Sequence, residues 1–157
     1  MTLQLFPVFI TFVIYRKRHR PAALVRVLAD PGPDEGILFR DPNAPSSIDP
    51  ASYFDWWPTK GTTEWVEYTF QKPATVSEVQ VYWFDDTNQG EVRVPASWRI
   101  LYRDGDEWKP VTAHGPYGVE RDRYNRVTFA PLTTSALRLE LTMQPKWSAG
   151  LQEWKVK

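Results

Sequence analysis

The 157-residue chain has no cysteine, two histidines and a formal net charge of zero at pH 7. The absence of cysteine excludes disulfide bonds, thiol catalysis and zinc sites built on thiolates, and it leaves the redox compartment of the protein open. With only His19 and His114, the chain has almost no material for a Ser-His-Asp or Cys-His relay. Because nineteen basic residues balance nineteen acidic ones, no net field attracts polyanions, and we expect no nucleic-acid partner.

A hydrophobic run long enough to cross a membrane is missing at the N-terminus. Residues 3–15 are uncharged but are interrupted by Pro7, and the basic run 16–20 follows them. A membrane helix needs about 20 apolar residues, and a signal peptide carries its positive charge before the apolar stretch. Three interpretations stay open: a stop-transfer-like remnant, a native β-strand or docking segment, or a sequence foreign to the domain. We expect no membrane span, and treat 1–36 as an N-terminal extension and 37–157 as the domain.

Aromatic residues are abundant, with 8 Trp, 7 Tyr and 8 Phe. So many aromatic side chains must be buried in a core or used to bind a ligand. A chain of this length buries roughly 68 to 70% of its unfolded surface, enough for one self-sufficient domain. The function therefore depends on which aromatic side chains the core leaves over.

Strand signals recur along the chain, whereas no window of 11 residues has a helical period. Leu137, Leu139, Leu141 and Met143 alternate with polar residues, which is typical of a half-buried strand. Similar patterns occur in 65–70, 75–84, 98–103, 107–111, 126–129 and 151–156, with shorter apolar segments at 22–28 and 37–39. Asp104-Gly105 predicts a hairpin turn between two of them. Seven or more short strands predict an all-β sandwich.

Four runs, taken in order, resemble discoidin-like domains, also called coagulation-factor C-terminal-type or galactose-binding-like domains. They begin Trp56-Trp57-Pro58, Val76-Ser77-Glu78, Val94-Pro95-Ala96 and Ser148-Ala149-Gly150. The likeness covers about residues 38–157 and is closest to C-terminal modules of bacterial glycoside hydrolase family 127-type proteins. It implies a jelly-roll β-sandwich of about eight antiparallel strands, with sugar-binding loops at one end and often a structural calcium beside them.

The sequence favours binding over catalysis. Glycoside hydrolysis needs two carboxylates at a fixed separation across the scissile bond, and the proximity of acidic residues in the sequence does not establish that geometry. We therefore expect no enzyme activity. A sugar site instead combines an aromatic platform with polar groups at its rim, so the informative residues are aromatics in loops.

Trp147 is the first candidate, because it lies between Pro145 and Gly150 in the connection before the last strand. In sugar-binding members of the resembled family this loop often contributes the stacking aromatic. Arg93 can donate two coplanar hydrogen bonds to adjacent sugar oxygens, and Asp85 and Asp86 can accept from hydroxyls. The alternatives are a tryptophan that closes one end of the sandwich and a salt bridge within the loop.

Tyr117, His114 and Trp57 are further candidates. Tyr117 and His114 lie in a Gly-Pro-Tyr loop that also suits a simple turn with a packed ring. Of Trp56 and Trp57, we expect one in the core and the other exposed to ligand. The remaining tryptophans fall inside strand patterns and are assigned mainly to packing: Trp65, Trp83, Trp98, Trp108 and Trp154.

A calcium site is implied by the resemblance. In that family a glutamate near the final strand joins an early Asp-containing loop, and here Glu153 and Asp41 stand in those places. Calcium takes six to eight oxygen ligands, but the usual aspartate-glycine-aspartate loop is not intact in this chain. The alternative is that Glu153 is an edge-strand acid and Asp41 a turn residue next to proline.

Together these features predict a non-catalytic carbohydrate-binding module. We expect its partners to be a polysaccharide or oligosaccharide and a catalytic glycoside hydrolase domain of the same parent protein, in an extracellular or periplasmic bacterial location. The alternative is a structural accessory domain that packs against a catalytic domain and binds no sugar.

Overall fold

The computed structural model describes residues 13–14, 25–29, 37–38 and 53–157, with side chains from residue 53 onward. Every regular element in these residues is a strand, which confirms the all-β prediction. Within the same residues, no helix has the length and apolar character needed to cross a membrane.

The strands vary greatly in length, from two residues to 22. The long ones are β5 and β9, and they contain segments that the sequence patterns suggested were separate strands. In chain order the strands are β1 Val13–Ile14, β2 Val25–Ala29, β3 Ile37–Leu38, β4 Phe54–Asp55, β5 Thr63–Phe84, β6 Val92–Arg93, β7 Ser97–Asp104, β8 Glu107–Pro110, β9 Tyr124–Thr142 and β10 Ser148–Val156.

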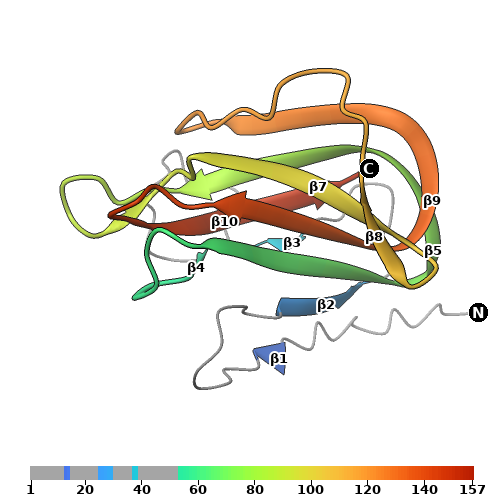
Figure 1. The fold of residues 1–157 in the computed structure, drawn as a ribbon, viewed down its shortest axis with the longest axis horizontal. Coiled ribbons are helices and arrows are strands. Elements are labelled where there is room, and N and C mark those ends of the chain that lie inside the picture. The colour runs from blue at the N-terminus through green and yellow to red at the C-terminus, as the bar shows by residue number, and fades with distance from the viewer. Residues whose placement is uncertain (1–12, 15–24, 30–36, 39–52) are drawn as a thin grey trace, which may run out of the picture.

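Strands β5 and β9 run together through both layers of the sandwich. They are paired antiparallel from Thr63↔Thr142 to Tyr82↔Tyr124, with register irregularities in the middle. Both ribbons curve around at the right-hand end of Figure 1, so each contributes one half to either layer. The first layer adds β1, β2, β7 and β8, and the second adds β10 with the short strands β3, β4 and β6. The β2–β5 and β6–β10 pairings are parallel and the others antiparallel.

The core follows from the period-two alternation of side chains. Leu137, Leu139, Leu141 and Met143 are buried, as the sequence pattern predicted. Val66, Tyr68 and Phe70 on β5 face them from the adjacent strand and are equally buried, as are Val79, Val81 and Trp83 farther along β5. Burial of these apolar side chains between the two layers is the main force that holds the sandwich closed.

The β7–β8 hairpin confirms the turn prediction, shifted by one residue. Asp104 pairs with Glu107, so the two-residue loop is Gly105 and Asp106. Gly105 has φ +58°, a value that glycine adopts without a Cβ penalty.

The predicted strands near residues 22–28 and 37–39 are present as β2 and β3. β2 extends the first layer by pairing with β5, from Arg26↔Glu67 to Ala29↔Phe70. β3 pairs with β10. The boundary between residues 36 and 37 stays a prediction.

Candidate functional site

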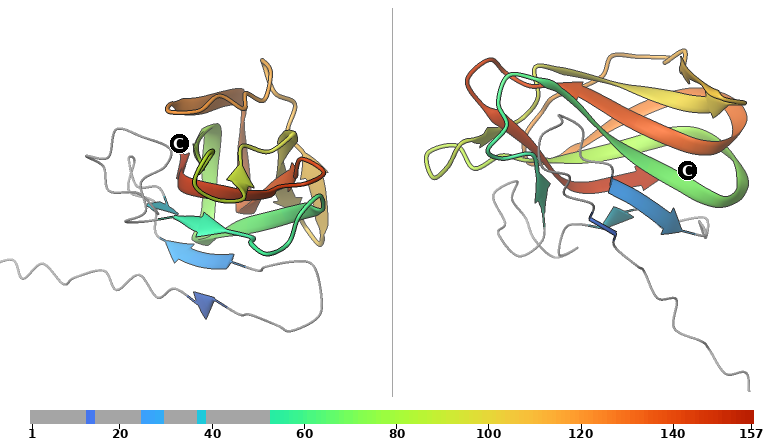
Figure 2. Two further views of the ribbon diagram at one scale, coloured as in Figure 1. Left: turned by 90° about the vertical axis from the view of Figure 1, so that its left-hand side faces the viewer. Right: turned by 60° about the horizontal axis from the view of Figure 1, so that its bottom comes forward.

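Three loops meet at one end of the sandwich, opposite the bends of β5 and β9. They comprise residues 56–62, 85–91 and 143–147, at the left in Figure 1 and toward the viewer in the left panel of Figure 2. The backbone N–H of Gly61 donates to the carbonyl of Trp147 at 3.3 Å, and that of Ser148 donates to the carbonyl of Glu91 at 3.0 Å. The loops are therefore held as one unit by their backbones.

Gly61 permits the close approach of the first and third loops. Its φ is +65°, and a Cβ built on it would lie 2.6 Å from the carbonyl oxygen of Pro145. That separation is shorter than any normal contact to a backbone atom, so only glycine fits here without movement of a loop.

Trp57 presents its indole to solvent from this end, as expected for one of the adjacent pair. Its exposed fraction is 51%, the largest among the bulky hydrophobic residues that the structure describes, whereas Trp56 is buried against Phe54. The Trp57 backbone N–H donates to Asp55 Oδ1 at 2.9 Å, and its Nε1–H donates to Glu91 Oε2 at 3.1 Å. Contacts at both the backbone and the ring edge fix the orientation of the exposed ring.

Glu91 and Lys60 form a charged pair at the edge of that ring. Lys60 Nζ lies 2.5 Å from Glu91 Oε1, and both side chains remain partly exposed, at 31% and 49%. The hydrogen bond from Lys60, and then the one from Trp57, lower the pKa of Glu91 below its ordinary value. The carboxylate therefore stays ionised at neutral pH, beside a cation that can donate and a ring that can stack.

Arg93 and Trp147 lie together, but each covers part of the other. The Arg93 guanidinium carbon is 4.0 Å from the centroid of the Trp147 ring. Arg93 Nη1 also donates to Asp86 Oδ1 at 3.1 Å and to the Val92 carbonyl at 2.6 Å. The salt bridge within the loop, which was the alternative to sugar binding, is thus present. Trp147 is half-buried and forms a wall of the loop cluster, with one ring face occupied.

Asp85 organises its own loop. Its side chain is buried, with Oδ1 accepting from the backbone N–H and hydroxyl of Thr87 and Oδ2 accepting from the backbone N–H of Val94. Arg121 approaches the same carboxylate at 3.5 Å. These contacts occupy both oxygens of Asp85, so its neighbour Asp86 is the more accessible acid of the two.

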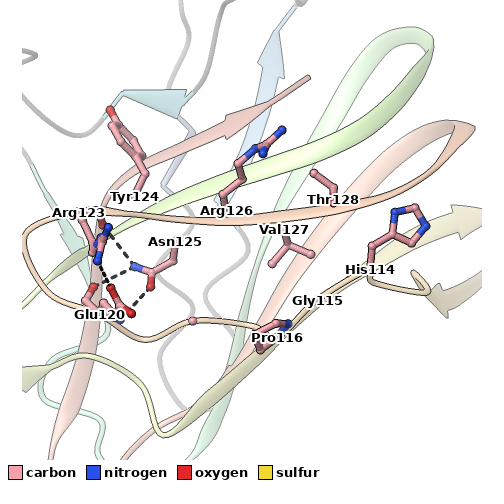
Figure 3. Close-up of a pocket in the computed structure, with 11 residues that line it drawn as sticks. His114, Gly115, Pro116, Glu120, Arg123, Tyr124, Asn125, Arg126, Val127 and Thr128 are labelled. Atoms are coloured by element: carbon pink, nitrogen blue, oxygen red, sulfur yellow. Dashed lines mark hydrogen bonds and ion pairs between the residues drawn. The ribbon is translucent and has the colours of Figure 1, made fainter.

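Tyr117 and His114 belong to the segment between β8 and β9. The Tyr117 ring packs edge-on against Trp98, with centroids 4.9 Å apart, and its hydroxyl accepts from the Ile100 backbone N–H. Burial raises the pKa of the Tyr117 hydroxyl. His114 is exposed and lines an open hollow of about 430 Å³ along the start of β9, which Figure 3 shows. The Tyr117 ring is therefore packed against the domain, which was the alternative to a ligand-binding role.

The calcium prediction rests on one described residue, because Asp41 lies outside the described part of the chain. Glu153 is buried, accepts a hydrogen bond from the Tyr124 hydroxyl and has Lys155 Nζ at 3.1 Å from Oε1. No group of three His, Cys, Asp or Glu suited to a metal occurs in the described residues. Among the described residues Glu153 pairs with an ammonium group, and the calcium site, which would need oxygen ligands from the loop of Asp41, stays a prediction.

Sequence patterns did not identify Lys60 as a candidate binding residue, and they assigned Glu91 no role in binding sugar at the loop end. The two residues lie 31 positions apart, and Trp57 lies 34 positions from Glu91. No local pattern joins such positions, since only the meeting of the loops brings them together.

The F5/8 type C domain profile matches residues 41–153. The chain belongs to this discoidin-like family. The match runs from the segment before β4 to Glu153 of β10, so it includes all three loops. As a member of the family, the chain is a non-catalytic binding domain.

Solved structures share the fold of this discoidin-like domain. A chain of the Streptococcus pneumoniae β-galactosidase BgaA superposes with a TM-score of 0.64 at 19% identity, covering 81% of this chain and 87% of that one. The family 32 carbohydrate-binding module of C. perfringens NanJ, in complex with galactose, gives 0.51 at 15% identity, covering 78% and 90%. Chitosan-binding module 1 of a Paenibacillus sp. IK-5 chitosanase/glucanase gives 0.50 at 16% identity, covering 69% and 78%.

Proposed function

We propose that this discoidin-like domain is a carbohydrate-binding module whose site is the loop cluster around Trp57. The observation that carries the proposal is an exposed indole with an ionised carboxylate and an ammonium group fixed at its edge. Two neighbours in fold, the module with galactose and the chitosan-binding module, support the same ligand class.

The chemistry of the cluster suits a sugar ring. A pyranose presents an apolar C–H face that can stack on the Trp57 indole. Glu91 would then accept from one hydroxyl while Lys60 donates to its neighbour, which gives orientation as well as contact area. Because the site is shallow, we expect single-site dissociation constants in the micromolar to millimolar range.

The proposed role is to hold a catalytic glycoside hydrolase domain of the same parent protein near its polysaccharide. Binding of this kind raises the effective concentration of substrate without any chemistry by the module. The location proposed with this role is extracellular or periplasmic in a bacterium, where polysaccharide is available. The likeness to a chain of BgaA, a β-galactosidase, supports this association.

Affinity electrophoresis through gels that contain galactan, arabinan or xyloglucan tests the proposal. We expect at least one polysaccharide to retard the protein, and Trp57→Ala to raise the dissociation constant about tenfold by removing the stacking surface. Trp108→Phe is the control, because that half-buried residue lies in β8, beside the hairpin turn at the other end of the sandwich, and phenylalanine keeps a ring against Arg138.

No retardation in any gel would favour the accessory domain that binds no sugar. Equal losses from Trp57→Ala and Trp108→Phe would instead show that the loop cluster is not the site.

A further inference from the structure

A second polar hollow lies on the outer face of the first layer, on strands β5, β9 and β7. Its volume is about 480 Å³. The lining residues are Thr63, Ser97, Trp98, Arg99, Glu140 and Thr142. None of them belongs to the loops of the Trp57 cluster, although Thr63 and Thr142 adjoin two of those loops, so the hollow has its own set of lining residues.

The strand register arranges these side chains in two rows. Thr142 pairs with Thr63 on one side and with Ser97 on the other, which puts three exposed hydroxyls side by side. Thr63 Oγ1 and Thr142 Oγ1 are 3.3 Å apart. Two residues along each strand, on the same face, Glu140 pairs with Trp65 and with Arg99.

The second row combines a polar pair with an aromatic ring. Arg99 contacts Glu140 Oε1 through Nη2 at 2.6 Å and through Nε at 2.7 Å, yet the Arg99 side chain is 54% exposed. Trp65, across from Glu140, is held by the Arg138 guanidinium carbon at 4.0 Å from its centroid. A ligand in the hollow would therefore meet hydroxyls and exposed guanidinium donors, with Trp65 on the strand beside Glu140 at its border.

The charge of this surface selects the kind of ligand. The only charged residues lining the hollow are Arg99 and Glu140, which neutralise one another. A polyanion would gain nothing from such a pair and would be repelled by Glu140. A neutral sugar, by contrast, offers hydroxyls that both donate to Glu140 and accept from Arg99 and the hydroxyl row.

We propose that this outer face is a second carbohydrate-binding surface, for a neutral polysaccharide chain. The ligand class rests on the proposed function, but the surface uses none of the same residues. A module whose two surfaces engage the same long chain binds it with an avidity greater than that of either surface alone.

The experiment uses the full chain in gels with galactan, arabinan or xyloglucan and combines two sets of substitutions. Arg99→Gln with Glu140→Gln removes the ion pair of the outer face while keeping side-chain size. Arg126→Gln with Glu78→Gln is the matched control, since it removes an ion pair of the same type from the other layer. Urea denaturation of each variant confirms that it is folded.

We expect Trp57→Ala to leave residual retardation that the added Arg99→Gln and Glu140→Gln changes abolish. When Trp57 is kept, Arg99→Gln with Glu140→Gln should weaken retardation at least threefold. The control substitutions Arg126→Gln with Glu78→Gln should not alter retardation. Residual retardation that survives in the combined variant would overturn the second surface and leave the loop site standing. Loss with the outer-face pair but not with Trp57→Ala would instead overturn the loop site. Absence of retardation by every polysaccharide would overturn both.

Discussion

At Gly61 the lack of a side chain lets two loops share a backbone hydrogen bond. Gly61→Ala would place a methyl group 2.6 Å from the Pro145 carbonyl oxygen, at a φ of +65°. We expect the substitution to lower the free energy of unfolding by about 1 to 3 kcal/mol, because both the φ angle and the close contact oppose it. Urea denaturation followed by tryptophan fluorescence measures the change.

Gly115 provides the control for this prediction. A Cβ at Gly115 has nothing within 4 Å, and its φ is outside the region that favours glycine. Gly115→Ala should therefore change the free energy of unfolding by less than about 1 kcal/mol, or stabilise the domain slightly. Equal effects of the two substitutions would contradict the role given to Gly61.

At the scale of the element, β9 carries a cation stack on its outer face. The Arg138 guanidinium carbon lies 4.0 Å from the Trp65 ring centroid and 4.1 Å from that of Trp108, and Nη2 contacts Glu67 at 3.2 Å. Trp65 and Trp108 are packing residues, as the sequence indicated, but they pack against Arg138 on the surface and do not lie in the core. Of the five tryptophans assigned to packing, Trp83, Trp98 and Trp154 are buried in the core.

Arg138→Lys tests this stack. Lysine keeps the charge but loses the planar group that contacts both indoles, so we expect the free energy of unfolding to fall by about 1 to 2 kcal/mol. Arg126→Lys is the matched control, because Arg126 on the same strand pairs with Glu78 and is 63% exposed. A loss at Arg126 equal to that at Arg138 would show that the stack on the two indoles is not the cause of the lost stability.

The sequence predicted the faces of the strands better than their lengths. The alternation in 136–143 assigned each side chain of that segment to the correct face because burial on one side of a sheet imposes period two. The joining of 65–70 and 75–84 into β5 was not predicted, since Pro73 between them reads as a break. The ladder has a register irregularity between Thr69 and Ala74, which accommodates this proline.

The candidate site was predicted only in part, for a similar reason. Local patterns place Trp57, Arg93 and Trp147 in loops but do not say which ring is covered. Arg93 lies over Trp147 and leaves Trp57 as the more open surface. Such contacts depend on long-range pairing of the loops, which sequence neighbours do not encode.

For the whole molecule, the titrating groups predict that stability is constant between an acid and an alkaline pH limit and falls beyond each. The hydrogen bonds from Arg126 and Lys60 lower the pKa of Glu78 and Glu91 below their ordinary 4.5, so the stability that these groups contribute is present above that value and lost as pH falls. Burial raises the pKa of Tyr117 and Tyr124 above 10.0, so stability is present below that value and lost as pH rises. Melting temperatures measured across pH should show both declines.

Single substitutions can show which residue causes the acid decline in stability and which causes the alkaline decline. Glu78→Gln should make the acid decline shallower, and Tyr117→Phe should do the same for the alkaline one. If Tyr117→Phe left the alkaline limb unchanged, the raised pKa of that hydroxyl would not be a cause of the decline.

The sharing of β5 and β9 between both layers also has a mechanical consequence. A bound polysaccharide would pull on the loop end, while the bends of both strands close the opposite end. Because ladder hydrogen bonds lie perpendicular to the strands, a pull along β5 loads many of them in shear at the same time instead of opening them one by one. Because β5 and β9 belong to both layers, the layers cannot separate unless the bends of these two strands unfold, so we expect the domain to resist tension along its length.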